Sequence, residues 1–418
     1  MQNHPADQEP RRVLGSFFAP KSQNTPTWEQ RKLGEICDFI TKGATPTTYG
    51  FSWQPDGVPF FRNDSIKDNV FVFGEFSYIS EAANEVLKRS EVHGNDILIA
   101  ITGDIGKVGI IPDTVEKANI NQHIARVRIR KEALPYFVYQ YLASDDTQKE
   151  YQKIKTGLSM PQLSLEQVRD IVVKIPEFNE QGKIAGCLRR IDTLITLHQR
   201  KYEKLVNIKK SMLDKMFPQN GVSVPEIRFK GFTDPWEQRK FSELYEKVSR
   251  KNDLTYGKDD IISVANMYYK AESYITDENY LLTYNVFEMG DIAFEGNKSK
   301  NFAHGRFVEN TIGNGIVSHV FDVFKPRMTN YDLQFWKYAI NNERIMGPIL
   351  LRSTKASTMM TNLVADDFLQ ENFLIPCYEE QKKIGEFLNQ LDTLITLHQR
   401  KLEKLQNIKK SCLEKMFV

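Results

Sequence analysis

The side chains that most resemble a reactive centre lie in the stretch DTLITLHQRK, which occupies residues 192–201 and recurs unchanged at residues 392–401. Each copy offers one imidazole, at His198 and His398, followed by an arginine and a lysine. A histidine can serve as a general base or a metal ligand, and both kinds of chemistry require partner groups within reach. No second metal ligand lies near either copy. The other interpretation is a histidine inside a helix seam, where it hydrogen-bonds across the seam and fixes its register.

The four cysteines do not form a metal-binding pattern. Cys37, Cys187, Cys377 and Cys412 are widely spaced, and none has a cysteine or histidine at ligand spacing. This spacing argues against a zinc site and favours reduced thiols in a cytosolic protein. The sequence also has no signal peptide and no apolar run near 18 residues, so we expect no membrane partner.

Known catalytic motifs are missing from the sequence. GDIGKVG at residues 103–109 resembles the tail of a phosphate-binding loop. The full pattern has a glycine where this chain has Ile101 and a serine or threonine where it has Val108, so the pattern is not met. Pro112 and Asp113 could open a nuclease motif, yet no Glu-x-Lys follows at a useful spacing. Serine-hydrolase, zinc-protease and kinase motifs are absent, as is the Asn/Asp-Pro-Pro-aromatic tetrapeptide of adenine methyltransferases. We therefore expect a protein that binds. The alternative is an enzyme with an unrecognised motif, such as a stand-alone nuclease or methyltransferase.

A larger repeat contains the two decapeptides. Residues 180–217 and 380–417 are identical at 27 of 38 positions. Similar starts lie upstream, WEQRKLGEI at residues 28–36 and WEQRKFSEL at residues 236–244, and the sequences between start and repeat differ strongly. We interpret the chain as a tandem duplication in which the two copies remain similar at their ends and have diverged in their middles. A repeat period of roughly 200 residues marks duplicated domains and not a solenoid.

Each long repeat is predicted to form one helix. Apolar residues recur at alternating spacings of four and three, which is the pattern of a coiled coil, and 38 helical residues span about 57 Å. Because such a stripe cannot stay exposed, we expect the two helices to pair antiparallel about a pseudo-two-fold axis. The predicted seam residues are Ile184, Leu188, Ile191, Ile195, His198, Leu205, Ile384, Leu388, Leu391, Ile395, His398 and Leu405.

Charge is concentrated on the same two repeats. The chain of 418 residues carries a net charge of only +2, so any nucleic acid must be bound through local patches. The first repeat carries +5 and the second +3, which leaves −6 for the remaining residues. The lysine runs are explained either as solvated helix faces or as contacts with phosphate or a partner protein.

The divergent middles indicate mixed α/β structure. Residues 96–102, 108–112 and 124–130 predict strands, whereas residues 133–144 and 331–341 predict helices. Polar loops between them carry the basic, amide and hydroxyl side chains that read base edges and clamp phosphates, although each loop alone could be ordinary surface. The candidate DNA-binding residues are Lys42, Thr45, Thr47, Arg62, Asn63, Lys107, Gln122, His123, Lys155, Ser159, Gln162, Lys298, Lys300, Arg306, His319, Arg352, Lys355 and Ser357.

Two diverged α/β units, each followed by a near-identical heptad helix, resemble the specificity subunit of type I restriction-modification systems. The resemblance covers residues 25–418, and its most specific parts are WEQRKLGEI, GNDILIAITGDIGKVG, the Ile-Pro and Glu-Gln junctions and the two LITLHQRK helices. It implies that each divergent unit is a target recognition domain reading one half of a split, asymmetric site in double-stranded DNA. The helices would set the spacing and dock modification subunits.

The fold class that follows is α+β, with two mixed α/β recognition domains joined by two long antiparallel coiled-coil helices and internal pseudo-two-fold symmetry. We expect a poorly ordered polar leader before the part that the resemblance covers. The implied division is residues 1–24 leader, 25–178 first recognition domain, 179–218 central helix, 219–235 linker, 236–378 second recognition domain and 379–418 C-terminal helix.

The resemblance also implies the chemistry of the partners. The chain itself would be non-catalytic and would hold no cofactor or metal. S-adenosylmethionine, ATP and magnesium would belong to two modification (methyltransferase) subunits and to the restriction (translocase and nuclease) subunits. The alternative is a coiled-coil adaptor whose α/β parts bind protein, and that protein would show absent or salt-insensitive DNA binding.

Overall fold

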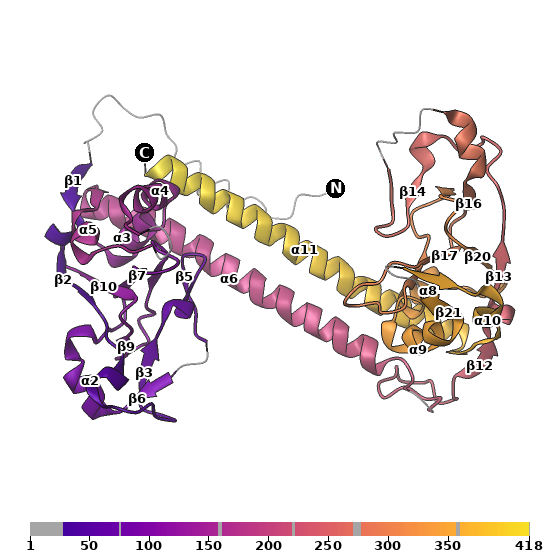
Figure 1. The fold of residues 1–418 in the computed structure, drawn as a ribbon, viewed down its shortest axis with the longest axis horizontal. Coiled ribbons are helices and arrows are strands. Elements are labelled where there is room, and N and C mark those ends of the chain that lie inside the picture. The colour runs from indigo at the N-terminus through magenta and orange to yellow at the C-terminus, as the bar shows by residue number, and fades with distance from the viewer. Residues whose placement is uncertain are drawn as a thin grey trace. The chain divides into compact units, whose positions relative to one another are not determined.

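The computed structural model describes residues 28–74, 77–157, 161–219, 222–270, 277–356 and 360–417, so the predicted leader lies outside it. The chain divides into two compact units, the first formed by residues up to Leu197 and from Leu402 onward, the second by His198–Lys401. Each unit therefore contains one end of each long helix, α6 (Phe178–Lys215) and α11 (Tyr378–Met416), which Figure 1 labels. No helix in the described ranges is long and apolar enough to cross a membrane.

The first unit is built on a four-stranded antiparallel sheet with the order β2-β10-β7-β8. A second, three-stranded sheet with the order β6-β3-β9 forms an outer lobe together with α2, and β3 pairs with β9 in parallel. β7, β8 and β10 confirm the three strands predicted from sequence. The bounds are β2 (Cys37–Lys42), β3 (Val58–Phe61), β6 (Ser77–Ile79), α2 (Glu81–Val86), β7 (Ile97–Ala100), β8 (Val108–Ile110), β9 (Asn119–Ile120) and β10 (Ile124–Ile129).

The second unit repeats this plan with a different sequence. Its main sheet has the order β13-β20-β17-β18, which is the same topology as in the first unit, and two small strand pairs, β14-β15 and β16-β19, lie outside it. The duplication inferred from the ends of the repeat therefore extends through the diverged middles. The bounds are β13 (Tyr245–Val248), β14 (Ile262–Ser263), β15 (Tyr268–Tyr269), β16 (Asn285–Phe287), β17 (Ile292–Glu295), β18 (Arg306–Glu309), β19 (Gly315–Val317) and β20 (Val323–Pro326).

One helix in each unit joins the sheet to the long helices. α3 (Pro135–Leu142) buries Phe137, Val138 and Leu142 against the first main sheet and the start of α6. α8 (Leu333–Ala339) buries the equivalent face against the second main sheet and the start of α11. Both helices were predicted from sequence. Each buries apolar side chains between the main sheet and the long helix, and this burial stabilises the contact between them.

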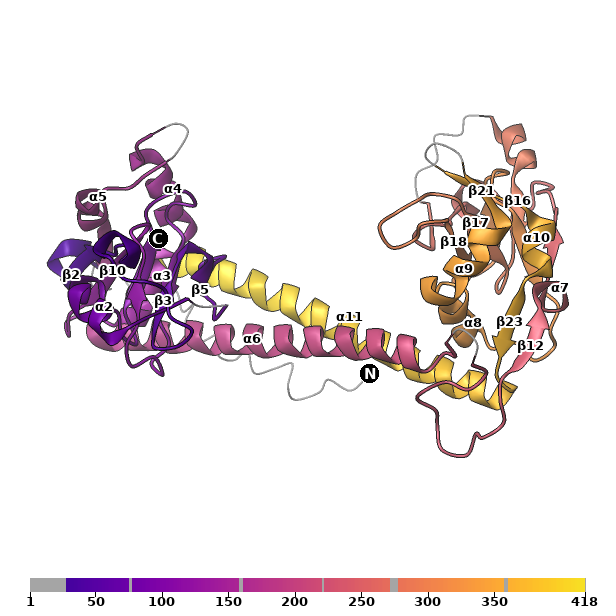
Figure 2. The same cartoon turned by 60° about the horizontal axis from the view of Figure 1, so that its bottom comes forward.

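The repeated WEQRK starts form a strand at the base of each unit. β1 (Glu29–Lys32) pairs antiparallel with β11 (Val172–Ile175), and β12 (Glu237–Lys240) pairs with β23 (Asn372–Ile375) in the same register. β12 and β23 lie side by side in Figure 2. The predicted Ile-Pro junctions are therefore the strand ends at which the chain turns into each long helix.

The tryptophan before each of these strands packs on the end of the other copy's helix. The Trp28 ring lies edge-on to Phe137 at 5.8 Å and to Phe417 at 6.2 Å between ring centroids. Trp236 lies in the same way 5.8 Å from Phe217 and 6.0 Å from Phe335. The start of one copy is thus fastened to the last turn of the other copy within each unit.

The long helices run antiparallel within each unit. In the first unit Lys409 Nζ lies 2.8 Å from Asp192 Oδ1, and in the second unit Lys209 Nζ lies 2.6 Å from Asp392 Oδ1. These pairs confirm the predicted antiparallel orientation. The seam residues Ile184, Leu188, Ile191, Ile384, Leu388 and Leu391 are buried, and Ile195, His198, Leu205, Ile395, His398 and Leu405 are half-buried.

The same aspartates also hold the helix that carries each sheet. Asp192 Oδ2 accepts hydrogen bonds from Tyr136 Oη at 2.6 Å and from Gln140 Nε2 at 2.7 Å, both on α3. In the second unit Tyr338 Oη donates to Asp392 Oδ2 at 2.7 Å. Burial and the adjacent carboxylate raise the pKa of Tyr136 and Tyr338 far above the ordinary range, so both phenols remain neutral donors.

The two histidines of the decapeptides meet in the second unit. His198 Nδ1 and His398 Nδ1 lie 2.8 Å apart, so one imidazole donates to the other. Burial, the facing histidine and the ammonium groups of Lys401 and Lys201 lower the pKa of His198. Burial and the same two lysines lower the pKa of His398. The lowered pKa values favour the neutral form of both rings, and at least one ring must be neutral to accept the hydrogen bond across the seam.

Replacing Asp192 with asparagine tests the junction of α3, α6 and α11. We expect Asp192→Asn to lower the free energy of unfolding by about 1–3 kcal/mol, because Lys409 would be left partly buried without its partner. Urea denaturation followed by circular dichroism measures the change. Asp170→Asn, which breaks the exposed ion pair with Lys32, is the control and should cost less than about 1 kcal/mol. Equal losses in the two variants would contradict the assignment.

The histidine pair predicts a pH-dependent stability. Because the folded chain has the lower pKa, the unfolded chain takes up protons first, and stability falls as the pH drops below about 6.5. We expect the melting temperature to fall about 1–4 °C more between pH 7.5 and 5.5 in the native chain than in the double variant His198→Leu, His398→Leu. His319→Leu, which removes an exposed imidazole, should behave like the native chain. An unchanged pH dependence in the double variant would refute the prediction.

Candidate nucleic-acid interface

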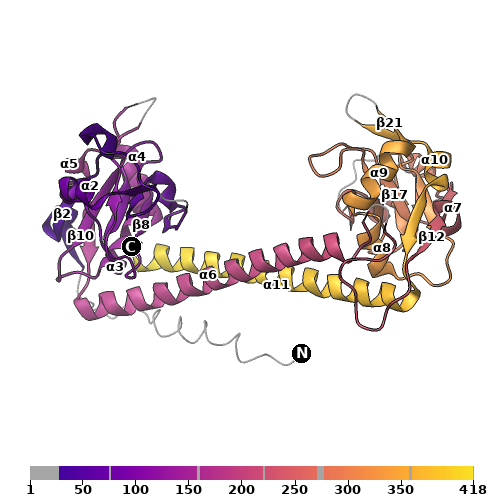
Figure 3. The same ribbon diagram turned by 90° about the horizontal axis from the view of Figure 1, so that it is seen from below.

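Each unit carries a short hairpin in the segment that precedes its Ile-Pro junction. In the second unit β21 (Thr354–Ala356) pairs with β22 (Thr361–Leu363), and in the first unit Thr156 pairs with Gln162 as an isolated bridge. Within the second unit, Figure 3 shows β21 on the side of the sheet away from α11. The two hairpin tips, which include the candidates Ser159 and Ser357, lie outside the described residues.

Main-chain contacts join each hairpin to the loop that follows the central strand. Gln162 bridges to Thr102, just after β7, and the Leu163 amide donates to the Ile101 carbonyl at 2.9 Å. In the second unit Met360 bridges to Asn297, just after β17, and the next amide along the hairpin donates to the Gly296 carbonyl at 2.8 Å. The backbone framework of the two hairpins is therefore the same.

Five of the predicted residues come together beside the first hairpin. Thr45 Oγ1 donates to Gln122 Oε1 at 2.6 Å, and the Gln122 amide nitrogen lies 3.2 Å from His123 Nε2. Asn63 Nδ2 donates at 2.9 Å to the Thr102 carbonyl, and Thr102 forms the bridge with Gln162. We call these residues the loop cluster: Thr45, Asn63, Gln122, His123 and Gln162.

A glycine allows the loop cluster to form. A Cβ on Gly43 would lie 1.8 Å from the Ile120 carbonyl oxygen and 2.4 Å from the Asn121 carbonyl oxygen. No side chain fits at that distance, so the chain carrying Thr45 can approach the chain carrying Gln122 only with glycine at this position.

Five other described candidates of the first unit lie outside the loop cluster, and three of them are engaged by neighbouring side chains. Arg62 donates to Ser77 Oγ at 2.8 Å, Lys107 pairs with Asp104 at 2.7 Å, and Lys155 donates to Gln152 at 2.9 Å. Lys42 and Thr47 are exposed, on β2 and on the turn that follows it. These five contribute positive charge and hydroxyl groups, and their contact with DNA stays a prediction.

The candidates of the second unit differ in how exposed they are. Arg306 donates to Glu295 Oε2 and to the Ala265 carbonyl, each at 2.7 Å, which makes it part of the packing of β17 and β18. Arg352 forms a two-pronged pair with Glu371. Exposed positions are occupied by Lys298 and Lys300 in the loop after β17, by His319, and by Lys355 on β21. Exposed lysines therefore occur in both units, at Lys42 and Lys155 in the first and at Lys298, Lys300 and Lys355 in the second.

A buried ion pair fixes the start of the central strand in each unit. Arg128 on β10 contacts the buried Asp96 at 2.6 Å, and Arg250 contacts the buried Asp291 in the second unit. Burial raises the pKa of Asp291 to about 6, although the guanidinium opposes this shift. Arg128 lies on β10, whereas Arg250 lies just after the end of β13, so the two units place an arginine beside this aspartate from different parts of the fold.

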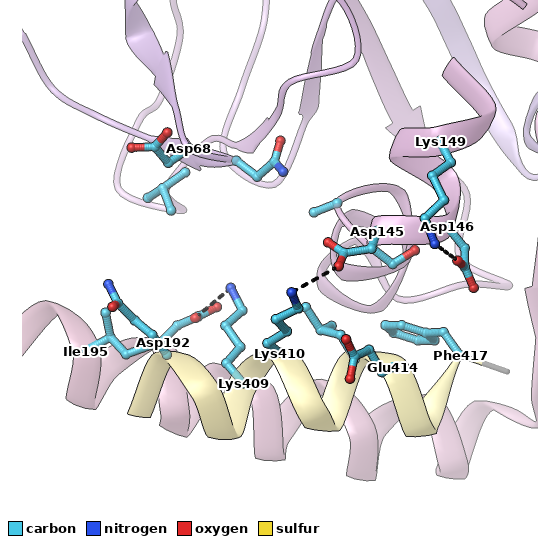
Figure 4. A pocket seen from close by; sticks show the side chains of 16 residues that line it. Asp68, Asp145, Asp146, Lys149, Asp192, Ile195, Lys409, Lys410, Glu414 and Phe417 are labelled. Atoms are coloured by element: carbon cyan, nitrogen blue, oxygen red, sulfur yellow. Dashed lines mark hydrogen bonds and ion pairs between the residues drawn. The ribbon is translucent and has the colours of Figure 1, made fainter. Parts of the chain in front are cut away.

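A cavity with a volume of about 420 Å³ lies in the first unit. It is bounded by the turn at Asp68, by α4 (Asp145–Ile154) and by the last turns of α11. Figure 4 shows its charges paired within the lining: Asp192 with Lys409, Asp145 with Lys410, and Asp146 with Lys149. We assign it to packing between α4 and α11. In the described parts of the chain no three histidine, cysteine or acidic residues gather as a metal site would require.

The decapeptides also carry exposed leucines that are not part of the seam. Leu194 and Leu197 on α6 are 39% and 44% exposed, and Leu394 and Leu397 on α11 are both 43% exposed. Heptad positions place these leucines on one flank of the seam and the aspartates that hold α3 and α8 on the other. An identical apolar pair therefore occurs on the flank of each unit that does not carry the sheet.

Sequence analysis missed the role of Asp192 and Asp392 and the exposed leucine pairs. Both features could be predicted from the heptad pattern, because residues directly beside a seam position face a flank of the helix pair and not its core. An aspartate repeated at such a position predicts a fixed partner. A leucine repeated there predicts an uncovered apolar surface.

Comparison with known proteins places the chain in one family. The type I restriction modification DNA specificity domain matches residues 26–207 and again residues 233–407. The MjaVIII specificity subunit of Methanocaldococcus jannaschii is 23% identical over 92% of this chain and 90% of its own length. The EcoBI specificity subunit of Escherichia coli is 29% identical over 41% of this chain and 36% of its own length.

Solved structures share the fold. The type I restriction-modification S subunit from M. genitalium superimposes with a TM-score of 0.60 and 15% identity, covering 95% of this chain and 98% of that one. A second structure, from work on complex assembly and conformational transition of the type I R-M system, gives a TM-score of 0.50 and 15% identity, with 95% and 99% covered. At this identity the likeness concerns the fold alone.

Proposed function

The chain belongs to the family of type I restriction-modification DNA specificity subunits, and from this we propose that it reads a bipartite, asymmetric DNA site. The divergent part of each unit would bind one half of the site. The observation that carries the proposal is that the two hairpins are joined to the loop after the central strand by equivalent bridges but carry different side chains there, Gln162 in the first unit and Met360 in the second. Different groups at equivalent positions are what two different half-sites require.

Two recognition units reading together give more discrimination than one. Each correctly read base pair contributes roughly 1–3 kcal/mol, so a unit that reads three or four base pairs cannot by itself select a rare site. Linking two units through a helical spacer makes the second binding event effectively intramolecular. We propose that α6 and α11 set the distance between the half-sites, which must suit the helical repeat of DNA, about 34 Å.

The leucine flanks suggest where the partner subunits bind. Each flank is an apolar strip beside lysine and arginine, and it occurs in an identical decapeptide in each unit. We propose that each flank docks one modification subunit through a helix with apolar side chains. Catalysis, and with it S-adenosylmethionine, ATP and magnesium, would then belong to the modification and restriction subunits and not to this chain.

Selection from random duplexes tests the bipartite proposal. We expect the chain in complex with its modification subunits to enrich two short motifs of different sequence at a constant gap. Binding should weaken steeply with salt, because phosphate contacts release counterions. Sequencing of the bound DNA identifies the motifs, and titrations at two salt concentrations measure the slope. A single palindromic motif, no enrichment, or base methylation or cleavage by the chain alone would contradict the proposal.

Charge introduced on one leucine flank tests the docking surface. We expect Leu194→Lys with Leu197→Lys to weaken binding at that flank by about 2 kcal/mol or more, because burying ammonium groups in an apolar contact is unfavourable. Native mass spectrometry should then show one bound modification subunit where the unaltered chain binds two. Thr193→Lys with Thr196→Lys, which adds the same charge on exposed positions of the same helix turn, is the control. Two bound subunits in the leucine variant would refute the docking surface.

A further inference from the structure

Trp53 is an exposed tryptophan whose ring is nevertheless fixed. It is 37% exposed, in the outer lobe of the first unit. Its ring centroid lies 5.1 Å from that of Phe60, nearly perpendicular to it, and the Arg62 guanidinium lies over the ring at 4.8 Å. Large aromatic side chains contribute stability when they are buried, so a clamped but exposed indole has a surface available for a ligand.

The clamp connects Trp53 to the loop cluster. Arg62 is itself held by Ser77 Oγ at 2.8 Å, which fixes the guanidinium over the indole. The next residue, Asn63, belongs to the cluster and donates to the Thr102 carbonyl at 2.9 Å. Trp53 and Arg62 therefore border the group of side chains for which DNA contact is proposed.

We propose that Trp53 stacks against a base that is unstacked from the duplex in the first half-site, with Arg62 beside it as a phosphate contact. The inference rests on the proposed function and deepens it. A modification subunit that acts on a base must take that base out of the helix, which exposes base faces at the opened step. A preorganised indole binds such a face at little entropic cost, and the planar guanidinium suits both the ring and a phosphate.

Stacking and base reading make different predictions for this residue. An aromatic face accepts any base, so stacking raises affinity without selecting a sequence. Loss of Trp53 should therefore weaken binding and leave the enriched motif unchanged. A residue that read a base edge would change the motif, and a collapsed outer lobe would erase the first half of it.

The experiment uses the full chain in complex with its modification subunits. Random duplexes are first selected with the unaltered complex, and affinities are then measured for the selected duplex. We expect Trp53→Ala to weaken binding about 10- to 100-fold, and Trp53→Phe to stay within about fivefold of the unaltered chain. Trp53→Leu, which keeps apolar cover on Phe60 but has no flat ring, should behave like the alanine variant.

Phe178 provides the matched control, because it is an exposed aromatic (53%) at the first turn of α6. Phe178→Ala should leave affinity unchanged. Native affinity in Trp53→Ala or in Trp53→Leu, or an equal loss in Phe178→Ala, would overturn the stacking contact while the bipartite motif of the unaltered complex still stands. Failure of the unaltered complex to enrich any split motif would overturn both proposals.

Discussion

An antiparallel pair built from two copies of one helix brings residues of one copy against residues of the other, and this constraint governs the chain. Asp192 pairs with Lys409, and Lys209 pairs with Asp392, so each copy supplies one acid and one base at the same positions. A change in one copy alone would break one of the two pairs and leave a partly buried charge without a partner, which is more costly than changing both partners. The DTLITLHQRK stretch therefore makes the same ion pair in both copies, through Asp192 in one and Asp392 in the other.

The constraint extends to the ends of each copy. Trp28 packs against Phe417 and Trp236 against Phe217, so the first residue of one WEQRK start depends on the last helical turn of the other copy. Together with the hydrogen bonds from Tyr136 and its counterpart on α8 to the aspartates, these contacts fasten each sheet to both long helices within its unit. A recognition surface can be positioned accurately only on elements that are themselves rigidly supported.

The periodicity of the sequence predicted helices and strands, which depend on local pattern. It did not predict side-chain contacts between residues that lie far apart in the sequence. The heptads predicted both long helices and their antiparallel pairing, and short β-branched runs predicted β7, β8 and β10. The loop cluster could be predicted only as separate loops, because Thr45 and Gln122 meet through a close backbone approach at Gly43 that no local pattern reveals. Arg306 and Arg352 looked like free cations in the sequence, since the acids that engage them lie elsewhere in the chain.

The same physics explains how the middles can diverge while the scaffold does not. Each hairpin is joined to the central strand through the main chain, by bridges at Thr102 with Gln162 and at Asn297 with Met360. Backbone hydrogen bonds of this kind do not depend on which side chain a residue carries. The hairpin can therefore carry Gln162 in one unit and Met360 in the other without losing its position, whereas the seam cannot exchange Asp192 without losing a partner. Side chains that could contact DNA lie where substitution costs little stability, and the side chains that fix distance and orientation lie where it costs most.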